Sequence, residues 1–338
     1  RQSGGLHQEA NVSGVGILPV RFTRESHANT WVNILWDFLY SYRALGNIPS
    51  ADVIVTNCFW LPVLLRFSKH RRTKAYVNVA RQPKRQLGLY AFLGTHGFVA
   101  VSQAVARRIH SQSARAYART HVVPNPVEEK YFNEAKALDW VKRKPAIVYT
   151  GRVHPEKGLH ILLRALGVLR EKKTPVPLKV IGPWKSEAGG GGVAYKRDLE
   201  RLAEGLDVEF SPATYDRKQL AETLARYRFF CYPSLSEQGE SFGIAPLEAM
   251  GVGTIPILSS LECFREYAKP GANCFSFDHR GAGEDSELAV RLAEVIGEAI
   301  DGSDQLEAMS KAAMETARRF SVDAVTRQYL ALFEEELG

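Results

Sequence analysis

A strand-like run followed by a loop and a helix constrains this chain more than any other feature. Residues 228–232 are rich in aromatic side chains, and residues 239–251 carry two carboxylates, Glu240 and Glu248, on either side of Gly243. A helix that begins at this glycine points unpaired N–H groups and the positive end of its dipole toward the loop, where a phosphate binds well. We therefore expect both carboxylates to reach a phosphorylated sugar that lies across the helix start.

This segment resembles the signature of retaining GT-B glycosyltransferases, in particular the large family 4, in which two glutamates flank such a helix start. The similarity continues through residues 252–257. Two glutamates at this spacing also occur on solvated helix faces. The resemblance therefore rests on the whole of residues 239–257 and not on the two glutamates alone. The resemblance implies that Glu240 holds hydroxyls of the donor sugar and that Glu248 holds the ribose hydroxyls. It also implies donor-binding roles for the residues at the helix start, namely Ser241, Phe242, Gly243 and Ile244.

A second strand–loop–helix segment agrees with the first. Residues 146–150 are predicted to form a buried strand, and residues 159–172 have the periodicity of an amphipathic helix. In the family, the loop at this place binds the donor diphosphate, and the loop between these two elements is similar to it. The resemblance therefore implies that Gly151, Arg152 and Lys157 bind the diphosphate. Fixed cations at this place stabilise the charge that a leaving diphosphate gains. The alternative is that they are ordinary surface charges, but cations are unfavourable at a helix N-terminus.

The resemblance extends to the rest of the donor site. It implies that the loop with Thr214 and Tyr215 meets the nucleotide base. It also implies that Gly4 and Gly5 belong to a glycine loop after a first strand, and that strand is missing from this sequence. By this resemblance, the reaction is expected to need no metal and no other cofactor, because cations and helix amides neutralise the diphosphate. It needs no enzyme base either, since the departing phosphate oxygen accepts the acceptor's proton. We expect a UDP- or GDP-sugar as the donor.

Residues 184–192 follow a predicted strand and include four successive glycines. One interpretation is a phosphate-binding loop. Glycine adopts many backbone conformations, so a run of glycines has no fixed geometry of its own. We favour a mobile flap.

The chain of 338 residues is long enough for two domains, and strands that alternate with helical segments predict parallel α/β layers. The resemblance implies the GT-B fold, with two Rossmann-like domains that face a central cleft. We expect an acceptor-side N-terminal domain over residues 1–135 and a nucleotide-sugar domain over residues 136–320. Residues 321–338 are predicted to be a helix that crosses back to the N-terminal domain, with Tyr329, Leu330, Leu332 and Phe333 on its packing face.

The charge of the chain is divided unequally. Residues 1–144 hold 21 Lys and Arg against 8 Asp and Glu, a net charge of +13, whereas residues 145–338 hold 23 against 29, a net charge of −6. Residues 53–127 contain no acidic residue. The N-terminal half is therefore expected to meet an anionic or lipid-linked acceptor, and peripheral membrane association at a cytoplasmic face is consistent with it.

Residues 59–72 combine bulky apolar side chains with a basic end. One interpretation is an interfacial helix on an anionic membrane, and the other is a core helix of the α/β domain whose basic end is solvated. The candidate membrane or acceptor surface comprises Trp60, Arg66, Lys69, Arg71, Arg72, Arg81, Lys84 and Arg85.

Other partners and functions are less consistent with the sequence. Nothing in it resembles a nucleic-acid-binding motif, and nucleic acid would leave the donor motifs unexplained. The four cysteines have no C-x-x-C spacing, which predicts reduced thiols in a cytoplasmic protein. The predicted function is transfer of a sugar to a glycan, lipid-linked or small-molecule acceptor. The alternatives are a non-catalytic nucleotide- or carbohydrate-binding protein of the same fold and a related epimerase or phosphorylase.

Overall fold

The structure is a computed structural model. It describes residues 30–83, 94–134, 139–302 and 305–337. Four of the predicted site residues lie outside this described part, namely Gly4, Gly5, Lys84 and Arg85.

Contacts divide the chain into two compact units. The N-terminal unit comprises the chain up to Ala100 together with Ala106–His121, and the C-terminal unit comprises Val101–Val105 together with Val122–Glu336. The boundary after His121 lies ahead of residue 135 because helix α7 (Glu129–Glu134) packs against helices of the C-terminal unit. Each unit is described by itself.

The N-terminal unit contains a four-stranded sheet in the order β1-β2-β3-β4, and β1, β2 and β3 are parallel. Its strands are β1 (Val53–Thr56), β2 (Lys74–Val79), β3 (Gly97–Ala100) and β4 (Thr120–Val122), whose last residue passes into the C-terminal unit. Its helices are α2 (Thr30–Leu45), α3 (Trp60–Arg66), α6 (Ala114–Tyr117) and α5 (Gln103–Gln112), whose first three residues belong to the C-terminal unit. Helix α3 packs on the core of this unit through Leu61 and Leu65.

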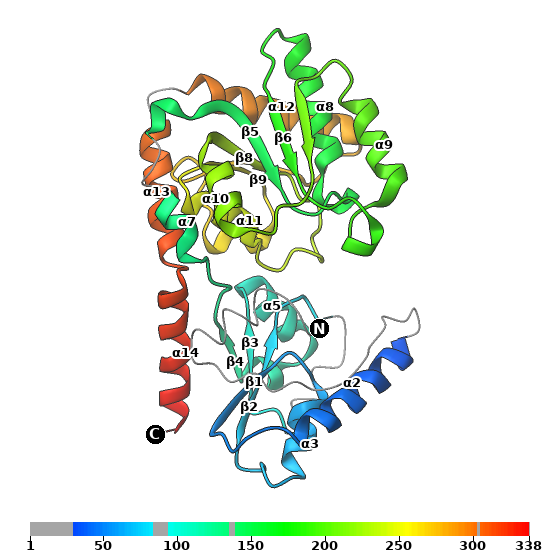
Figure 1. Ribbon diagram of the computed structural model, residues 1–338, viewed down its shortest axis with the longest axis vertical. Coiled ribbons are helices and arrows are strands. Elements are labelled where there is room, and N and C mark those ends of the chain that lie inside the picture. The colour runs from blue at the N-terminus through cyan, green and yellow to red at the C-terminus, as the bar shows by residue number, and fades with distance from the viewer. Residues whose placement is uncertain (1–29, 84–93, 135–138, 303–304, 338) are drawn as a thin grey trace. The chain divides into compact units, whose positions relative to one another are not determined.

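The C-terminal unit is built on a six-stranded parallel sheet in the order β10-β9-β8-β5-β6-β7 (Figure 1). Its strands are β5 (Lys144–Thr150), β6 (Leu178–Ile181), β7 (Val208–Ser211), β8 (Tyr227–Tyr232), β9 (Ile255–Ser259) and β10 (Phe275–Phe277). The chain builds β5, β6 and β7 outward on one side and then returns to build β8, β9 and β10 on the other. The strand order therefore reverses between β5 and β8.

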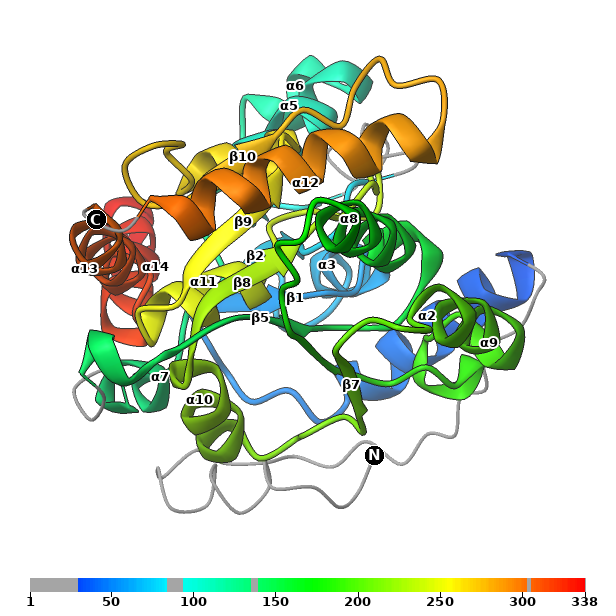
Figure 2. The same ribbon diagram turned by 90° about the horizontal axis from the view of Figure 1, so that it is seen from above.

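Helices cover both faces of this sheet. Helix α8 (Leu159–Glu171) and helix α12 (Asp285–Asp301) lie side by side over one face, and α10 (Arg217–Ala225) and α11 (Ile244–Gly251) pack against β8 from the other (Figure 2). The remaining helices are α9 (Gly192–Leu202), α13 (Leu306–Arg318) and α14 (Val322–Leu337), with short 3₁₀ turns η1 (Trp140–Lys142), η2 (Pro155–Lys157), η3 (Ser186–Ala188) and η4 (Glu262–Glu266). Because both faces are covered, the central strands contain continuous buried apolar runs, namely residues 146–149 in β5 and residues 229–232 in β8.

The elements predicted from local patterns are confirmed with small shifts at their ends. The predicted helix over residues 159–172 is α8, and the helix predicted after residue 321 is α14. One detail is wrong: Leu330 does not belong to the packing face of α14, because 52% of it is exposed, whereas Leu332 is buried. Buried positions 325 and 332 fall on one face at helical spacing. None of the described helices has the length and apolar character needed to cross a membrane.

Candidate donor site

The predicted donor residues gather where the strand order of the C-terminal sheet reverses. Neighbouring strands β5 and β8 lead into loops that diverge at their carboxyl ends, one toward α8 and the other toward α11. Open parallel sheets bind ligands in the crevice at such a switch point. Arg152 and Lys157 follow β5, and Glu240 follows β8. The topology therefore brings together the two cations predicted to bind the diphosphate and the carboxylate predicted to hold the donor sugar, the three residues for which we expect a catalytic role.

The two loops are held together by backbone contacts that only glycine allows. Gly158 has a φ of +68°, and a Cβ at this position would lie 2.0 Å from the carbonyl oxygen of Pro233. The amide of Leu235 donates a hydrogen bond of 2.9 Å to the carbonyl oxygen of Glu156. The two loops thus form one rigid platform at the switch point.

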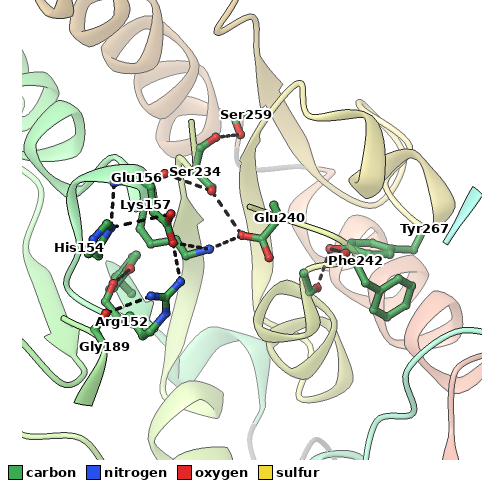
Figure 3. Close-up of polar contacts among 12 residues, drawn as sticks. Arg152, His154, Glu156, Lys157, Gly189, Ser234, Glu240, Phe242, Ser259 and Tyr267 are labelled. Carbon is green, nitrogen blue, oxygen red and sulfur yellow. Dashed lines mark hydrogen bonds and ion pairs between the residues drawn. The ribbon is translucent and has the colours of Figure 1, made fainter. Parts of the chain in front are cut away.

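Lys157 and Glu240 form a buried ion pair on this platform (Figure 3). Nζ of Lys157 lies 2.6 Å from Oε2 of Glu240, and only 6% and 10% of the two side chains are exposed. The Oγ atom of Ser234 donates to the same carboxylate oxygen at 3.3 Å. The ammonium also lies 5.6 Å from the ring centroid of Tyr232. Each charge is paired, so the pair persists although burial removes it from water.

Arg152 lies at the exposed side of the same platform. Its guanidinium forms an ion pair with Glu156 and donates a hydrogen bond of 3.0 Å to the carbonyl oxygen of Gly189. Its side chain is 43% exposed. Glu156 also approaches Lys157, with 3.8 Å between Oε1 and Nζ. A diphosphate that binds both cations must therefore compete with the carboxylate of Glu156.

The loop before α11 is fixed by a cluster of aromatic side chains. Gly243 has a φ of +76°, and a Cβ there would lie 2.4 Å from the ring of Phe264. The hydroxyl of Tyr267 donates to the carbonyl oxygen of Gly243 at 2.8 Å, and its ring packs on Phe242 at 5.7 Å between centroids. Helix α11 begins at Ile244. Its first N–H groups have no partner within the helix, and their predicted contact with an anion stays a prediction.

Glu248 lies on the second turn of α11 and has a neighbour that was not predicted. Its carboxylate accepts a hydrogen bond from the hydroxyl of Tyr131 on α7. Burial raises the pKa of Glu248 to about 7, although this hydrogen bond and the charge of Arg217 act in the opposite direction. The carboxyl of Glu248 therefore loses its proton near neutral pH. The sequence motif alone does not predict this raised pKa.

The glycine-rich loop over residues 184–192 has a defined structure, contrary to the expected flap. The amide of Gly191 donates a hydrogen bond of 2.8 Å to the carbonyl oxygen of Val153. The amide of Gly192 donates one of the same length to the carbonyl oxygen of Trp184. A Cβ at Gly190 would lie 2.2 Å from the backbone of Trp184. The glycines are thus needed for close approach of two backbones. Their loop forms one wall beside Arg152.

Thr214 and Tyr215 lie in the loop after β7, at the carboxyl edge of the same sheet. The side chain of Tyr215 is 80% exposed, and Thr214 is half-buried. One strand, β6, lies between β5, which leads to Lys157, and β7, which leads to this loop. The predicted contact with a nucleotide base stays a prediction.

The stretch over residues 59–72 is not one continuous helix, which corrects the expected arrangement. Helix α3 ends at Arg66, because the hydroxyl of Ser68 donates to the carbonyl oxygen of Leu65 and accepts from the amide of His70. Phe67 is consequently 81% exposed. The following turn carries Lys69, Arg71 and Arg72.

This basic set also divides between two edges of the sheet. Arg71 and Arg72 come directly before β2, whereas Arg81 comes directly after it. A strand of this length spans about 17 Å. Trp60 packs its ring against Phe38 with 5.5 Å between the ring centroids. The contact of this helix with a membrane stays a prediction.

Sequence reasoning missed the groups that hold the predicted residues in place. Ser234 and Tyr131 are the clearest cases. Both are buried, and each binds one of the motif glutamates. Ser234 stands two residues after the end of β8, where polar residues that follow a parallel strand often face a ligand, so this signal was present. Nothing in the local pattern around Tyr131 connects it with Glu248.

Solved structures share this architecture. A glycosyltransferase from Rickettsia africae superposes with a TM-score of 0.74 over 99% of this chain and 88% of its own, at 18% identity. The Anabaena protein HepE, in complex with UDP and glucose, gives a TM-score of 0.71 over 98% and 89% at 19% identity. These similarities confirm the predicted GT-B fold.

Relatives with known names also align with the chain. A D-inositol 3-phosphate glycosyltransferase of Corynebacterium urealyticum is 26% identical over 204 residues, which are 60% of this chain and 45% of that protein. A phosphatidyl-myo-inositol mannosyltransferase of Mycobacterium tuberculosis is 27% identical over 295 residues, which are 86% of this chain and 72% of that protein. The chain thus spans less than half the length of the first of these relatives.

The profile of the family described as "Glycosyl transferases group 1" matches residues 131–316. The match contains both strand–loop–helix segments of the switch point and more than half of the chain. It also contains the Lys157–Glu240 pair and Tyr131. The chain therefore belongs to the glycosyl transferases group 1 family.

Proposed function

We propose that this chain is a retaining glycosyltransferase that moves a sugar from a nucleoside-diphosphate sugar to an acceptor. The observation that carries the proposal is the buried Lys157–Glu240 pair at the point where the strand order reverses. A buried cation and a buried carboxylate beside a helix N-terminus supply groups for a diphosphate and for sugar hydroxyls in one place. Family membership and the shared fold support it.

The donor diphosphate is proposed to lie against the cations of the β5 loop and the start of α11. Arg152 gives up its contact with Glu156 and turns its guanidinium to the diphosphate. Lys157 keeps Glu240 as a partner, because an ammonium has three donors and the pair uses one of them. The amides of Gly243 and Ile244 complete the cradle. These groups stabilise the leaving diphosphate, and the reaction is proposed to need no metal.

The transfer itself is proposed to occur on one face of the sugar. The bond between the anomeric carbon and the diphosphate oxygen breaks, and the acceptor oxygen bonds to the same carbon from the same side. The departing phosphate oxygen accepts the proton of the acceptor hydroxyl, so charge and atoms balance without an enzyme base. Glu240 holds hydroxyls of the sugar, and Glu248 holds those of the ribose.

The donor is proposed to be a UDP- or GDP-sugar, and the acceptor an anionic or lipid-linked molecule. The named relatives act on inositol phosphate and phosphatidylinositol compounds, and the Anabaena protein holds UDP. The net charge of +13 over residues 1–144 favours an anionic acceptor. We place the acceptor at the carboxyl edge of the N-terminal sheet, where Arg81 lies, because parallel sheets bind at that edge. A lipid-linked acceptor would bring the chain to the cytoplasmic face of a membrane as a peripheral protein.

Release of nucleoside diphosphate from UDP-, GDP- and ADP-sugars tests the proposal. A transferase releases diphosphate slowly to water and faster with its acceptor, and the new glycosidic bond has the anomeric configuration of the donor, which NMR reads directly. A binding protein of the same fold would retain the donor without release. A phosphorylase would need inorganic phosphate, and an epimerase would give no acceptor product. Transfer with inverted configuration would contradict retention.

A further inference from the structure

The N-terminal unit contains a cavity of about 340 Å³ whose lining is strongly basic. Its charged lining residues come from the end of α3, the turn after it and the start of β2. They are Arg66, Arg71, Arg72 and Lys74, joined by the imidazole of His96. This volume lies within the range of pockets that take small molecules.

The cavity lies at the amino edge of the sheet. Lys74 is the first residue of β2, and His96 stands directly before β3, which runs parallel to it. The carboxyl edge, to which the acceptor is assigned, begins after Val79. The cavity is therefore separated from that edge by the length of the strand. It is a different site from the one proposed for sugar transfer.

Among the described residues, no carboxylate forms an ion pair with the charges that line the cavity, and the nearest one in the sequence is Asp52, whose carbonyl oxygen accepts a hydrogen bond from the amide of Lys74. Residues 53–127 contain no Asp or Glu. Within the described part of the chain, the side chains of Arg66, Arg71, Arg72 and Lys74 have no ion-pair or hydrogen-bond partner. Like charges that share one concave surface repel one another, and the surface focuses their field on whatever enters it. An anion in the cavity would relieve this repulsion.

The backbone around the cavity is shaped so that the basic side chains fit. Gly94 has a φ of +124°, which only glycine adopts readily. A Cβ at this position would lie 3.2 Å from Cδ of Arg66 and 3.3 Å from the carbonyl oxygen of Pro62. Because Gly94 has no side chain, the aliphatic part of the Arg66 side chain fits at the cavity wall. The ring of His96 packs edge-on against Tyr76, with 5.4 Å between centroids, which fixes the other wall.

We propose that this cavity binds a phosphate-bearing anion. Arginine presents a planar fork of donors that matches phosphate oxygens, and three arginines line one cavity here. The inference rests on the N-terminal unit alone and does not depend on the proposed transfer reaction. The phosphate belongs either to a soluble phosphorylated molecule or to a phospholipid headgroup, and the chemistry of recognition is the same for both.

Calorimetric titration with inorganic pyrophosphate tests the cavity directly. The full chain is used with Arg152→Ala in the background, so that the proposed donor site contributes little. We expect Arg71→Ala with Arg72→Ala to weaken pyrophosphate binding by about tenfold or more, since hydrogen bonds to charged groups are strong. Arg107→Ala with Arg108→Ala removes the same charge from the exposed face of α5 and should change the affinity less than about twofold. Equal losses in both variants, or no binding at low salt, would overturn the proposal.

A second readout reports the position of the bound anion. The imidazole resonances of His96, assigned by comparison with His96→Gln, should shift when pyrophosphate is added and should not shift in the Arg71→Ala and Arg72→Ala variant. Both arginines are exposed, so the thermal midpoint of this variant should match that of the unchanged chain. Binding without any response of His96 places the anion elsewhere and contradicts the assignment.

Co-sedimentation with vesicles distinguishes the two sources of phosphate. Vesicles of phosphatidylcholine with phosphatidic acid are compared with vesicles of phosphatidylcholine alone. Binding that needs phosphatidic acid, is released by pyrophosphate and is lost in the Arg71→Ala and Arg72→Ala variant assigns the cavity to a headgroup. Pyrophosphate binding without vesicle binding assigns it to a soluble molecule. Absence of both refutes the proposal.

Discussion

Nζ of Lys157 lies 2.6 Å from Oε2 of Glu240, although 83 positions separate the two residues in the sequence. Removal of either partner leaves a buried charge without its counterion, which costs about 3–5 kcal/mol of unfolding free energy. We expect Lys157→Met and Glu240→Gln each to destabilise the chain. The double variant should lose less unfolding free energy than the two single variants lose together. The difference, which is the coupling energy measured by urea unfolding, should be about 2 kcal/mol.

The exposed pair Lys311–Glu307 on α13 provides the control for this cycle. Its coupling should stay near 0.5 kcal/mol or less, because solvent screens it. If Lys157–Glu240 couples no more strongly than this pair, the two residues do not form the buried unit described here.

Arg152 should matter for turnover and not for stability. Its side chain is 43% exposed, so Arg152→Ala should leave the thermal midpoint nearly unchanged. Release of nucleoside diphosphate should fall by roughly 10²–10³, as when one donor to a transition-state charge is lost. Lys172→Ala, at the far end of α8, provides the control. If both variants release nucleoside diphosphate at the same rate, Arg152 does not belong to the donor site.

Glu248 should make stability depend on pH. Burial raises the pKa of its carboxyl from an ordinary 4.5 to about 7, so between these values the folded chain holds a proton that the unfolded chain has lost. Stability should therefore fall as pH rises through this window, by about 3 kcal/mol in total, and level off above it. Urea unfolding at pH 5 and pH 8 measures the fall. Glu248→Gln should remove it and be the more stable chain at pH 8.

The two motif glutamates should also differ in nucleotide binding. Glu248→Ala should weaken the affinity for free nucleoside diphosphate, because its carboxylate is proposed to hold the ribose hydroxyls. Glu240→Ala should leave that affinity nearly unchanged and reduce transfer, since its proposed partner is the sugar. Calorimetry with nucleotide alone separates the two. Equal losses of affinity would contradict the division of roles.

Two glycines close together in the sequence should respond oppositely to alanine. Gly158→Ala forces a positive φ on alanine and places its Cβ 2.0 Å from the carbonyl oxygen of Pro233, so the loops of the platform must separate. Gly167 lies inside α8 with nothing within 4 Å of an added Cβ. Gly167→Ala should stabilise the chain by up to about 1 kcal/mol, and Gly158→Ala should destabilise it and reduce turnover. Thermal melts of the two variants, together with release of nucleoside diphosphate, provide the comparison, and equal effects on stability would count against the rigid platform.

Local patterns predicted the parts of the site but not the way they meet. Strand β5 and helix α8 follow from a buried run and an amphipathic period, both of which are encoded within a few residues. The pairing of Lys157 with Glu240 depends on the order of the strands in the sheet. No local pattern specifies that order. The resemblance supplied the two residues as separate contacts of a donor and did not show that they bind each other.

The predictions that failed share a physical cause. A basic, apolar stretch predicted a helix as far as Arg72, but Ser68 binds the backbone on both sides and ends α3 at Arg66. The glycines of residues 189–192 predicted a loop without geometry, whereas contact with the β5 loop fixes them. In both cases a few specific hydrogen bonds decide the structure, and average residue preferences do not contain them.

Titration of the chain with UDP, GDP and ADP in the presence of EDTA tests the central claim most directly. The account predicts that one of these nucleotides binds without metal, and that Arg152→Ala weakens its affinity by about tenfold or more because a charged hydrogen bond is lost. Lys172→Ala should bind it as the unchanged chain does. If no nucleoside diphosphate binds, or if binding needs Mn²⁺ and is indifferent to Arg152, the proposed donor site is contradicted.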